Sequence, residues 1–345
     1  KTVKLIAGTV NACYDTAEVS LDIYEKPRAD FGWMNDCYSS GSPVGFLNQT
    51  LIQTSAYNSS WKVFSEGGSL LHTAETNDMQ YQFASDGIYS VELTAIADNG
   101  CSDTHVKEFR LHPTLAAGTD PYLDDFESMQ TNWYIPEGPG GSWELAAPAG
   151  PVISQAYSGT RAWMTNPTDN YLNNENSWIS GPCFDFREAR RPMLGMQTWT
   201  RIADPDDGVT LEFTTDGGNS WNPVGSTGDG RSLNWFNGNN LTGGHDGWTG
   251  NSDLGWKESR HELDALAGEP FVRFRIRLVS DDSSVGEGFA LDDIFVRERS
   301  RRVLLEHYTN ISESTAASAE TTVYDWAEDD SLGTVWVAYH TGFPG

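Results

Sequence analysis

The chain is poor in the residues that build metal and redox centres. Its four Cys, at positions 13, 37, 101 and 183, never form a C-x-x-C pair, and its seven His are scattered. Structural zinc sites and dithiol centres need closely spaced ligands, so neither is supported. The H-E-x-x-H, G-x-S-x-G, P-loop and G-x-G-x-x-G motifs are absent too, which removes the commonest motif-bearing hydrolases and nucleotide enzymes. These absences favour a non-catalytic protein.

Positive charge is also scarce. Lys and Arg number 22 against 49 Asp and Glu, which gives a formal net charge of -27 at pH 7. Phosphate binding needs clustered cations, so nucleic acid is not expected as a partner, whereas divalent cations are favoured. No apolar run approaches the roughly 18 residues of a membrane span. The amino end has neither Met nor the apolar stretch of a signal peptide, so we expect a processed or excised piece.

An internal repeat organises the first third of the chain. The pattern at residues 3–16 reappears at residues 91–104 with a constant offset of 88, which indicates a tandem domain. Both copies alternate apolar and polar residues, as half-buried strands do. One full repeat is predicted at residues 28–114. Residues 1–27 would be the last hairpin of a preceding copy whose start is missing.

The repeat resembles a known family. Its P-R-A-D-F at 27–31, G-I-Y-S-V-E-L at 87–93 and G-C-S-D-T at 100–104 are similar to PKD (polycystic kidney disease) repeats of secreted Bacteroidota surface proteins. The resemblance implies an immunoglobulin-like sandwich, export by the type IX system, and a Cys37–Cys101 disulfide that leaves Cys13 without a partner. The family's W-D-F-G-D-G is replaced by W-K-V-F-S-E-G-G at 61–68, which lacks both Asp residues.

A second domain is predicted at residues 119–298. Its strands are short and bounded by Gly, Asn and Asp turns, as at 209–213, 272–278 and 289–296, which favours a sandwich or jelly roll. The alternation at 272–278 places Arg273, Arg275 and Arg277 outward, on what we expect to be a solvated face. The L-D-D-F-E at 123–127 and the G-F-A-L-D-D-I at 288–294 resemble MAM-type and cleaved-adhesin-type jelly rolls, which are adhesion and carbohydrate-binding modules.

The last segment, residues 299–345, has a strand, helix, strand pattern. Strands are expected at 303–308 and 334–340 around a helix at 312–328. The segment resembles the start of a thioredoxin-like domain. A redox-active domain of that kind could carry C-x-x-C after its first strand, but this chain has N-I-S-E-S-T at 310–315, so thiol redox chemistry is not expected.

Acidic residues in the second domain predict a calcium site. Asp125 and Glu127 open the first strand of that domain, and Asp292 and Asp293 lie in its last. First and last strands of a jelly-roll sheet can be neighbours, which would gather the six to eight oxygen ligands that Ca²⁺ takes. The family resemblance implies the same structural site, with Glu127 and Asp293 as ligands and Asp125 and Asp292 as supports. The alternative is that these are acids facing turns.

Trp residues suggest a second kind of site. Trp235 and Trp248 lie in polar, Gly-rich runs, where an exposed indole next to Asn or Asp could stack on a sugar. The alternative is that they anchor the core or a loop. The T-T-D-G-G-N-S-W at 214–221 fits an Asp-box, which we interpret as a hairpin that stabilises the fold.

Taken together, the sequence predicts a mainly all-β protein of immunoglobulin-like and jelly-roll sandwiches with a truncated C-terminal β-α-β segment. We expect a non-catalytic adhesion or scaffold segment, secreted or at the cell surface, that binds glycans or surface proteins and carries structural Ca²⁺. Its sheet edges would permit self-association into arrays or fibres. The alternative is an accessory binding region of a secreted peptidase or glycosidase whose catalytic domain lies elsewhere.

Overall fold

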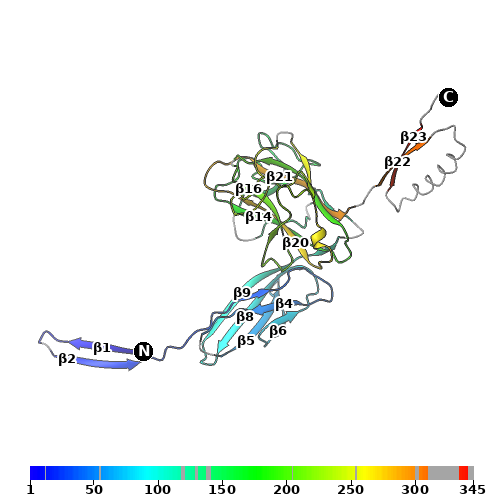
Figure 1. Ribbon diagram of the computed structural model, residues 1–345. Helices are drawn as coiled ribbons and strands as arrows, with labels where there is room; N and C mark the ends of the chain where they lie inside the picture. The colour runs from blue at the N-terminus through cyan, green and yellow to red at the C-terminus, as the bar shows by residue number, and fades with distance from the viewer. Residues whose placement is uncertain are drawn as a thin grey trace, which may run out of the picture.

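The structure, a computed structural model, describes residues 1–11, 13–53, 56–117, 121–128, 131–136, 141–203, 205–252, 255–299, 303–309 and 334–340. Nearly all the regular structure of these residues is β, which confirms the predicted class. Two sandwiches form the body, with an N-terminal hairpin and a C-terminal strand pair beyond them (Figure 1). The described part of the chain contains no helix that is long and apolar enough to span a bilayer.

The first sandwich is the predicted immunoglobulin-like repeat. Its three-stranded sheet, of order β3-β4-β7, consists of β3 (Phe31–Trp33), β4 (Val44–Asn48) and β7 (Met79–Tyr81). Its four-stranded sheet, of order β6-β5-β8-β9, consists of β5 (Tyr57–Ser65), β6 (Leu70–Ala74), β8 (Gly87–Ala97) and β9 (Ser102–Leu111). The alternation predicted for β8 is present, because Val91, Leu93 and Ala95 are fully buried. Val91 and Leu93 pack with Trp61 and Phe31 between the sheets.

The N-terminal hairpin repeats the last hairpin of this sandwich. Strands β1 (Thr2–Gly8) and β2 (Tyr14–Ser20) pair Leu5 with Ala17, and β8 and β9 pair Leu93 with His105, which is the same register shifted by 88 residues. All of β1 and β2 is exposed, including Leu5, whose counterpart is buried. The hairpin therefore has the register of a sandwich edge without a facing sheet.

The second sandwich has larger sheets. Its five-stranded sheet, of order β10-β14-β20-β16-β17, consists of β10 (Thr114–Ala116), β14 (Asn176–Asp185), β20 (Val272–Val279), β16 (Gly208–Thr214) and β17 (Asn222–Pro223). The facing seven-stranded sheet, of order β12-β13-β21-β15-β19-β18, consists of β12 (Trp143–Ala146), β13 (Ala162–Thr165), β21 (Gly288–Glu298), β15 (Pro192–Arg201), β19 (Lys257–Glu262) and β18 (Ser232–Leu233), with β11 (Tyr122–Asp124) beside β21. One 3₁₀ turn, η1 (Asp264–Leu266), follows β19.

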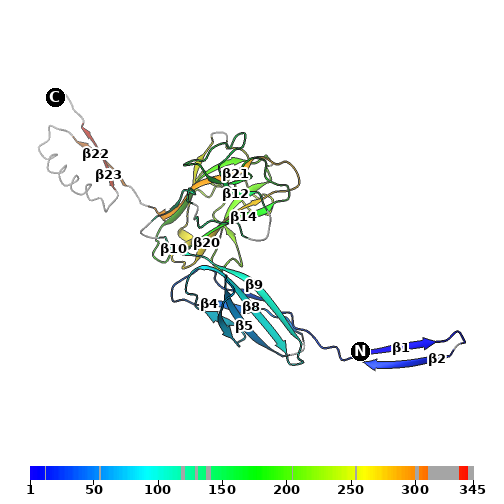
Figure 2. The same cartoon turned by 180° about the vertical axis from the view of Figure 1, so that it is seen from behind.

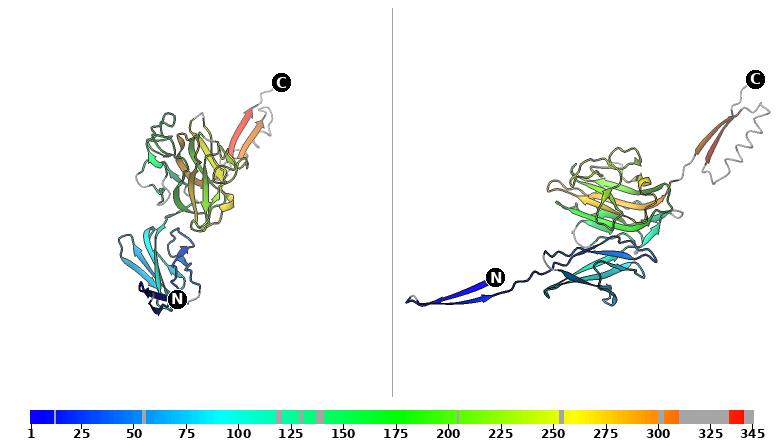
Figure 3. Two further views of the ribbon diagram at one scale, coloured as in Figure 1. Left: turned by 90° about the vertical axis from the view of Figure 1, so that its left-hand side faces the viewer. Right: turned by 60° about the horizontal axis from the view of Figure 1, so that its bottom comes forward.

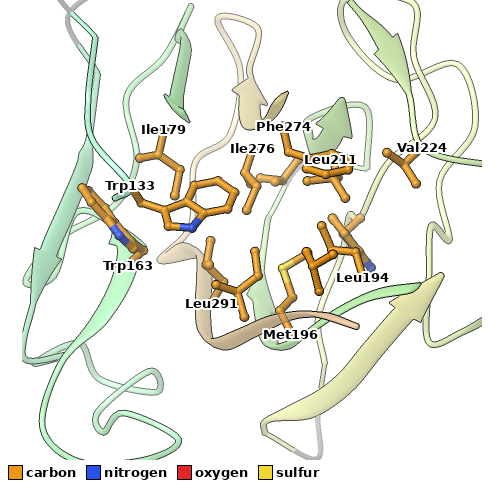
Figure 4. Packing of buried hydrophobic residues seen from close by; sticks show 14 of the residues in the cluster. Trp133, Trp163, Ile179, Leu194, Met196, Leu211, Val224, Phe274, Ile276 and Leu291 are labelled. Carbon is orange, nitrogen blue, oxygen red and sulfur yellow. The ribbon is translucent and has the colours of Figure 1, made fainter. Parts of the chain in front are cut away.

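Large apolar side chains fill the space between these two sheets. Figure 4 shows Trp133 and Ile179 facing Leu291 and Met196 across the interior. On β20 the predicted inward residues Val272, Phe274, Ile276 and Leu278 are fully buried, since their strand is central in its sheet.

The chain passes between the sandwiches through β10. This strand follows directly on the first sandwich and pairs in parallel with β14 at the edge of the five-stranded sheet, where Thr114 lies opposite Cys183. Figures 2 and 3 show the two sandwiches lying against each other at this junction. At the C-terminal end, β22 (Val303–Thr309) and β23 (Thr334–His340) pair in parallel, as the expected β-α-β segment requires. The helix expected at 312–328 lies outside the described residues.

Candidate functional site at the domain junction

A disulfide joins the two sandwiches. Cys37 of the first is bonded to Cys183 on β14 of the second, with 5.7 Å between their Cα atoms. Both residues are buried, at 3% and 0% exposure. Cys13 and Cys101 are free thiols. The Cys37–Cys101 pair implied by the PKD resemblance is therefore wrong, and the bridge links two domains instead of two sheets of one domain.

The course of β9 explains this correction. The backbone of Cys37 pairs with that of His112 in a parallel β-bridge, and His112 directly follows the end of β9. Cys101, in contrast, directly precedes the start of β9. The two positions are eleven residues apart along an extended strand, which spans roughly 35 Å. Cys37 and Cys101 thus lie at opposite ends of the first sandwich, and only Cys37 faces the second.

A buried ion pair lies beside the disulfide. The guanidinium of Arg273 on β20 donates hydrogen bonds to the carboxylate of Asp36 and, at 2.6 Å, to the hydroxyl of Ser180. Burial raises the pKa of Asp36, and the charge of Arg273 opposes that rise. Arg273 is only 7% exposed, so the expected solvated arginine face is wrong at this position. The reason is that the first sandwich covers this part of the sheet.

His112 forms a second contact across the junction. Its Nε2 lies 3.2 Å from the hydroxyl of Tyr134, and the two rings stack with centroids 5.4 Å apart. The guanidinium carbon of Arg110 lies 4.4 Å from the centroid of the Tyr134 ring. Burial, together with the charges of Arg273 and Arg110, lowers the pKa of His112 to about 2. His112 is therefore neutral at physiological pH.

The Asp-box hairpin completes the junction. Within it, the carboxylate of Asp216 accepts hydrogen bonds from the backbone N–H and the hydroxyl of Ser220, as expected for a structural turn. Its tip also contacts the first sandwich, because the amide of Asn219 donates to the carbonyl of Trp33 at 2.9 Å. At Gly217, where φ is +70°, a Cβ atom would lie 3.0 Å from the backbone of Asn35. Glycine thus allows close approach of the two domains.

A cleft of ≈ 390 Å³ opens along this junction. Trp33, Arg110 and His112 of the first sandwich line one side, while Trp178 and Trp221 of the second line the other. The residues of both walls lie in segments for which the sequence pattern predicted only strands or turns. The cleft was not predictable from the sequence, because its two walls belong to different domains and to positions far apart along the chain.

The predicted calcium ligands gather around one loop, residues 157–161. The carboxylate of Glu127 accepts backbone hydrogen bonds from Thr160 and Arg161 at 2.9 and 2.7 Å, which lower its pKa. Asp292 accepts from the backbone of residues 157 and 158, and Asp293 accepts from the hydroxyl of Ser158 at 2.7 Å. Burial raises the pKa of Asp292 to about 6.

These acids do not form a closed ligand shell. Asp125 is exposed, and its carboxylate accepts the backbone N–H of Glu127 rather than one from the loop. Within the described part of the chain, three potential ligand atoms come within 4.8 Å of one another only at Asp36, Cys37 and Cys183, where the sulfurs form the disulfide. The predicted calcium ligands therefore lie near a common loop, but the structure does not show them assembled into a site.

The predicted sugar-stacking residues belong to the core. Trp235 and Trp248 are only 5% and 4% exposed, and their ring centroids lie 4.8 Å apart. The indole N–H of Trp235 donates to the carbonyl of Val224, and that of Trp248 donates to the carbonyl of Asn234. Both rings are nearly buried, so the prediction that they are exposed indoles for sugar stacking is wrong. The polar residues around them form the turns that cover the rings.

Comparison with curated proteins gives one relevant similarity. The chain is 24% identical over 196 residues to bacillopeptidase F of Bacillus subtilis (strain 168), a match that covers 56% of this chain. The chain matches only 12% of the length of that peptidase. No protein-family model matches the chain.

Solved structures give weaker similarities. A carbohydrate-binding module of the β-sandwich superfamily has a TM-score of 0.30 and 13% identity and covers 78% of this chain and 97% of its own. A xylan-binding domain from Paenibacillus barcinonensis has a TM-score of 0.30 and 14% identity, with 54% and 100% coverage. A Bacteroides ovatus protein bound to a mixed-linkage heptasaccharide has a TM-score of 0.20 and 9% identity, with 80% and 100% coverage. TM-scores this low support no statement about the ligand of this chain.

Proposed function

We propose that this chain is an extracellular, non-catalytic binding segment in which two β-sandwiches act as one rigid unit. The observation that carries the proposal is the Cys37–Cys183 disulfide between the sandwiches. Disulfides persist in oxidising compartments and are rare in the cytosol, which supports an extracellular location. A bridge between two domains fixes their relative orientation, which a surface-binding protein needs and which a flexible linker would not supply.

The proposed ligands are glycans. Half-exposed Trp side chains and guanidinium groups line the junction, and such mixed aromatic and polar surfaces suit the apolar and hydroxyl faces of a sugar. The His261–Asp229 pair, which would be a candidate for acid–base chemistry, has both ring nitrogens engaged, with Asp229 at 2.6 Å and with the carbonyl of Glu262. The two ring nitrogens of His261 are thus occupied by groups of the protein itself.

We further propose that Ca²⁺ stabilises the loop at residues 157–161. Glu127, Asp292 and Asp293 present carboxylate oxygens to this loop, and oxygen is the ligand type that Ca²⁺ prefers. Asp292 is also a buried acid with a raised pKa, and a cation would offset its charge. Glu127 and Asp293 would hold the ion, and its role would be to fix the loop. The proposal requires the acids to rearrange from their present hydrogen bonds.

Thermal unfolding of the full chain, stripped with EGTA and then given millimolar Ca²⁺, tests the calcium site. We expect Ca²⁺ to raise the Tm, because an ion at 100 times its Kd stabilises the folded state by about 2.7 kcal/mol. Glu127→Gln and Asp293→Asn should abolish the rise. Asn suits position 293, where φ is +46°, because its side chain tolerates the left-handed conformation. Glu144→Gln, at an exposed position on β12, is the control and should keep the rise.

Failure of the two variants to remove the rise would place Ca²⁺ elsewhere, and the absence of any rise would leave these acids as turn-stabilising groups. The same preparations should then be screened against immobilised glycans with and without Ca²⁺. A chain that binds no glycan in either state would contradict the proposed ligand class.

A second candidate function is favoured by the similarity to bacillopeptidase F. A match that covers 12% of a peptidase is what an accessory region would give. In that case the same sandwiches would deliver a catalytic domain to its target. Catalytic activity in a longer form of this protein would distinguish the accessory role from adhesion.

A further inference from the structure

The cleft between the sandwiches contains a stack of alternating aromatic and cationic groups. The guanidinium of Arg275 lies 4.8 Å from the ring of Trp178 and 4.3 Å from that of Trp221, so it is held between two indoles. Arg273 lies 5.1 Å from the same Trp221 ring. These contacts fix the side chains before any ligand arrives, and pre-ordered groups lose little entropy on binding.

Two arginines in the cleft retain hydrogen-bonding capacity. Arg273 is more than nine-tenths buried, and among the described residues its Nε has no hydrogen-bond partner. Arg110 contacts the ring of Tyr134, and no carboxylate in the described part of the chain lies within ion-pair distance of it. A buried donor without an acceptor is costly, and a guanidinium pairs best with a carboxylate. Both arginines line the same cleft.

We propose that this cleft binds a carboxylate-bearing saccharide, with the uronate carboxylate near Arg110 and Arg273 and the sugar ring against the indoles. The cleft volume of ≈ 390 Å³ lies in the usual range for small-ligand sites. The inference rests on the proposed glycan-binding function and names the site and the ligand class. Arg110 has no acid partner within the described part of a chain whose net charge is -27, whereas Arg273 already shares its guanidinium with Asp36.

The disulfide would be part of the site. Arg110 belongs to the first sandwich and Arg273 to the second, so the two arginines face one ligand only while the domains hold their present orientation. Cys37 and Cys183 fix that orientation a short distance away, since Cys37 follows Asp36, the partner of Arg273. Loss of the bridge should therefore weaken binding even where both sandwiches remain folded.

The test is calorimetric titration of the full chain, in EGTA to exclude calcium bridging, with galacturonate, glucuronate and mannuronate disaccharides and their carboxyl-reduced counterparts. We expect at least one acidic disaccharide to bind about tenfold or more tightly than its neutral form, as for a hydrogen bond between charged groups. Arg110→Gln should remove that preference. Glu108→Gln, which removes an acid from the same wall of the cleft, should instead strengthen binding by up to about fivefold.

The opposite effects of these two variants separate a direct role from a general loss of structure, and their melting temperatures should match that of the parent chain. Equal binding of acidic and neutral disaccharides would overturn the carboxylate assignment and leave glycan binding intact. Acidic binding that is insensitive to Arg110→Gln and Glu108→Gln would overturn the cleft as the site. The absence of binding by every saccharide would overturn both this inference and the proposed glycan-binding function.

Discussion

At the scale of single residues, His112 is a group whose ionisation is strongly opposed by its surroundings. It is 4% exposed, and the cations Arg110 and Arg273 both lower its pKa. In the unfolded chain its pKa would be the ordinary value of 6.5. Because the folded state resists protonation, the unfolded state binds the extra proton first as the pH falls below 6.5. Stability should consequently be complete above that pH and decline below it.

The measurement is urea unfolding of the parent chain and of His112→Gln between pH 7.5 and pH 5.5. His112 should cost the parent about 1.4 kcal/mol of unfolding free energy for each pH unit below 6.5. Asp36 also faces this ring and is present in both proteins. Parallel pH profiles for the two proteins would contradict the expectation.

Arg273 shows what a local pattern can and cannot predict. Its alternation with Val272 and Phe274 correctly identified which side of β20 faces the core. The pattern holds no information about a second domain lying over the opposite side, so the ion pair with Asp36 was unpredictable. The disulfide escaped prediction for the same reason, since Cys37 and Cys183 belong to different domains.

At the scale of strands, β14 links the core to the junction. Its register against β20 shifts between Ser180 and Cys183, and Gly181 lies in this bulge. A Cβ atom at Gly181 would approach the ring of Trp133 to 2.8 Å. Trp133 is buried in the core and has little room to move away. Glycine at position 181 therefore lets the bulge pass close to this ring.

Gly181→Ala should therefore lower the unfolding free energy by about 1–3 kcal/mol, the usual cost of overpacking a core. The comparison is Gly67→Ala in the turn between β5 and β6, where the nearest atom to a new Cβ is 3.9 Å away. Denaturant unfolding of both variants measures the difference. Equal effects would show that the bulge absorbs the extra methyl group.

Several strands were predictable, whereas the pairing of the strands in the second sandwich was not. The expected strands at 209–213, 272–278 and 289–296 are confirmed as β16, β20 and β21, because each is a short apolar-rich run of strand length. The parallel addition of β10 to β14 and the short strands β17 and β18 had no signal. Their pairing depends on partners far away in sequence, which a local period does not contain.

At the scale of the whole molecule, the disulfide and the buried ion pair join two domains that each have a core of their own. The bridge spans a sequence separation of 146 residues. On the chain-entropy model, closing a loop of that length contributes up to about 5 kcal/mol to stability. We therefore expect the two sandwiches to unfold in one calorimetric transition.

The double variant Cys37→Ser, Cys183→Ser should split this transition into two and lower the Tm of the less stable sandwich. The double variant Cys13→Ser, Cys101→Ser is the matched control, because both of its thiols are free. Scanning calorimetry of the three proteins, each without reductant, decides the question. Two transitions in the parent chain would mean that the sandwiches unfold independently despite the bridge.

The position of the disulfide also matters for mechanical load. If the chain is pulled from its two ends, tension that enters near the N-terminal hairpin passes covalently from Cys37 to Cys183. Most of the first sandwich and the first strands of the second then lie in a loop that bears no force. Extension of that loop, roughly 500 Å at about 3.5 Å per residue, is unavailable while the bridge is intact. The bridge would let the chain transmit tension across the junction without unravelling it.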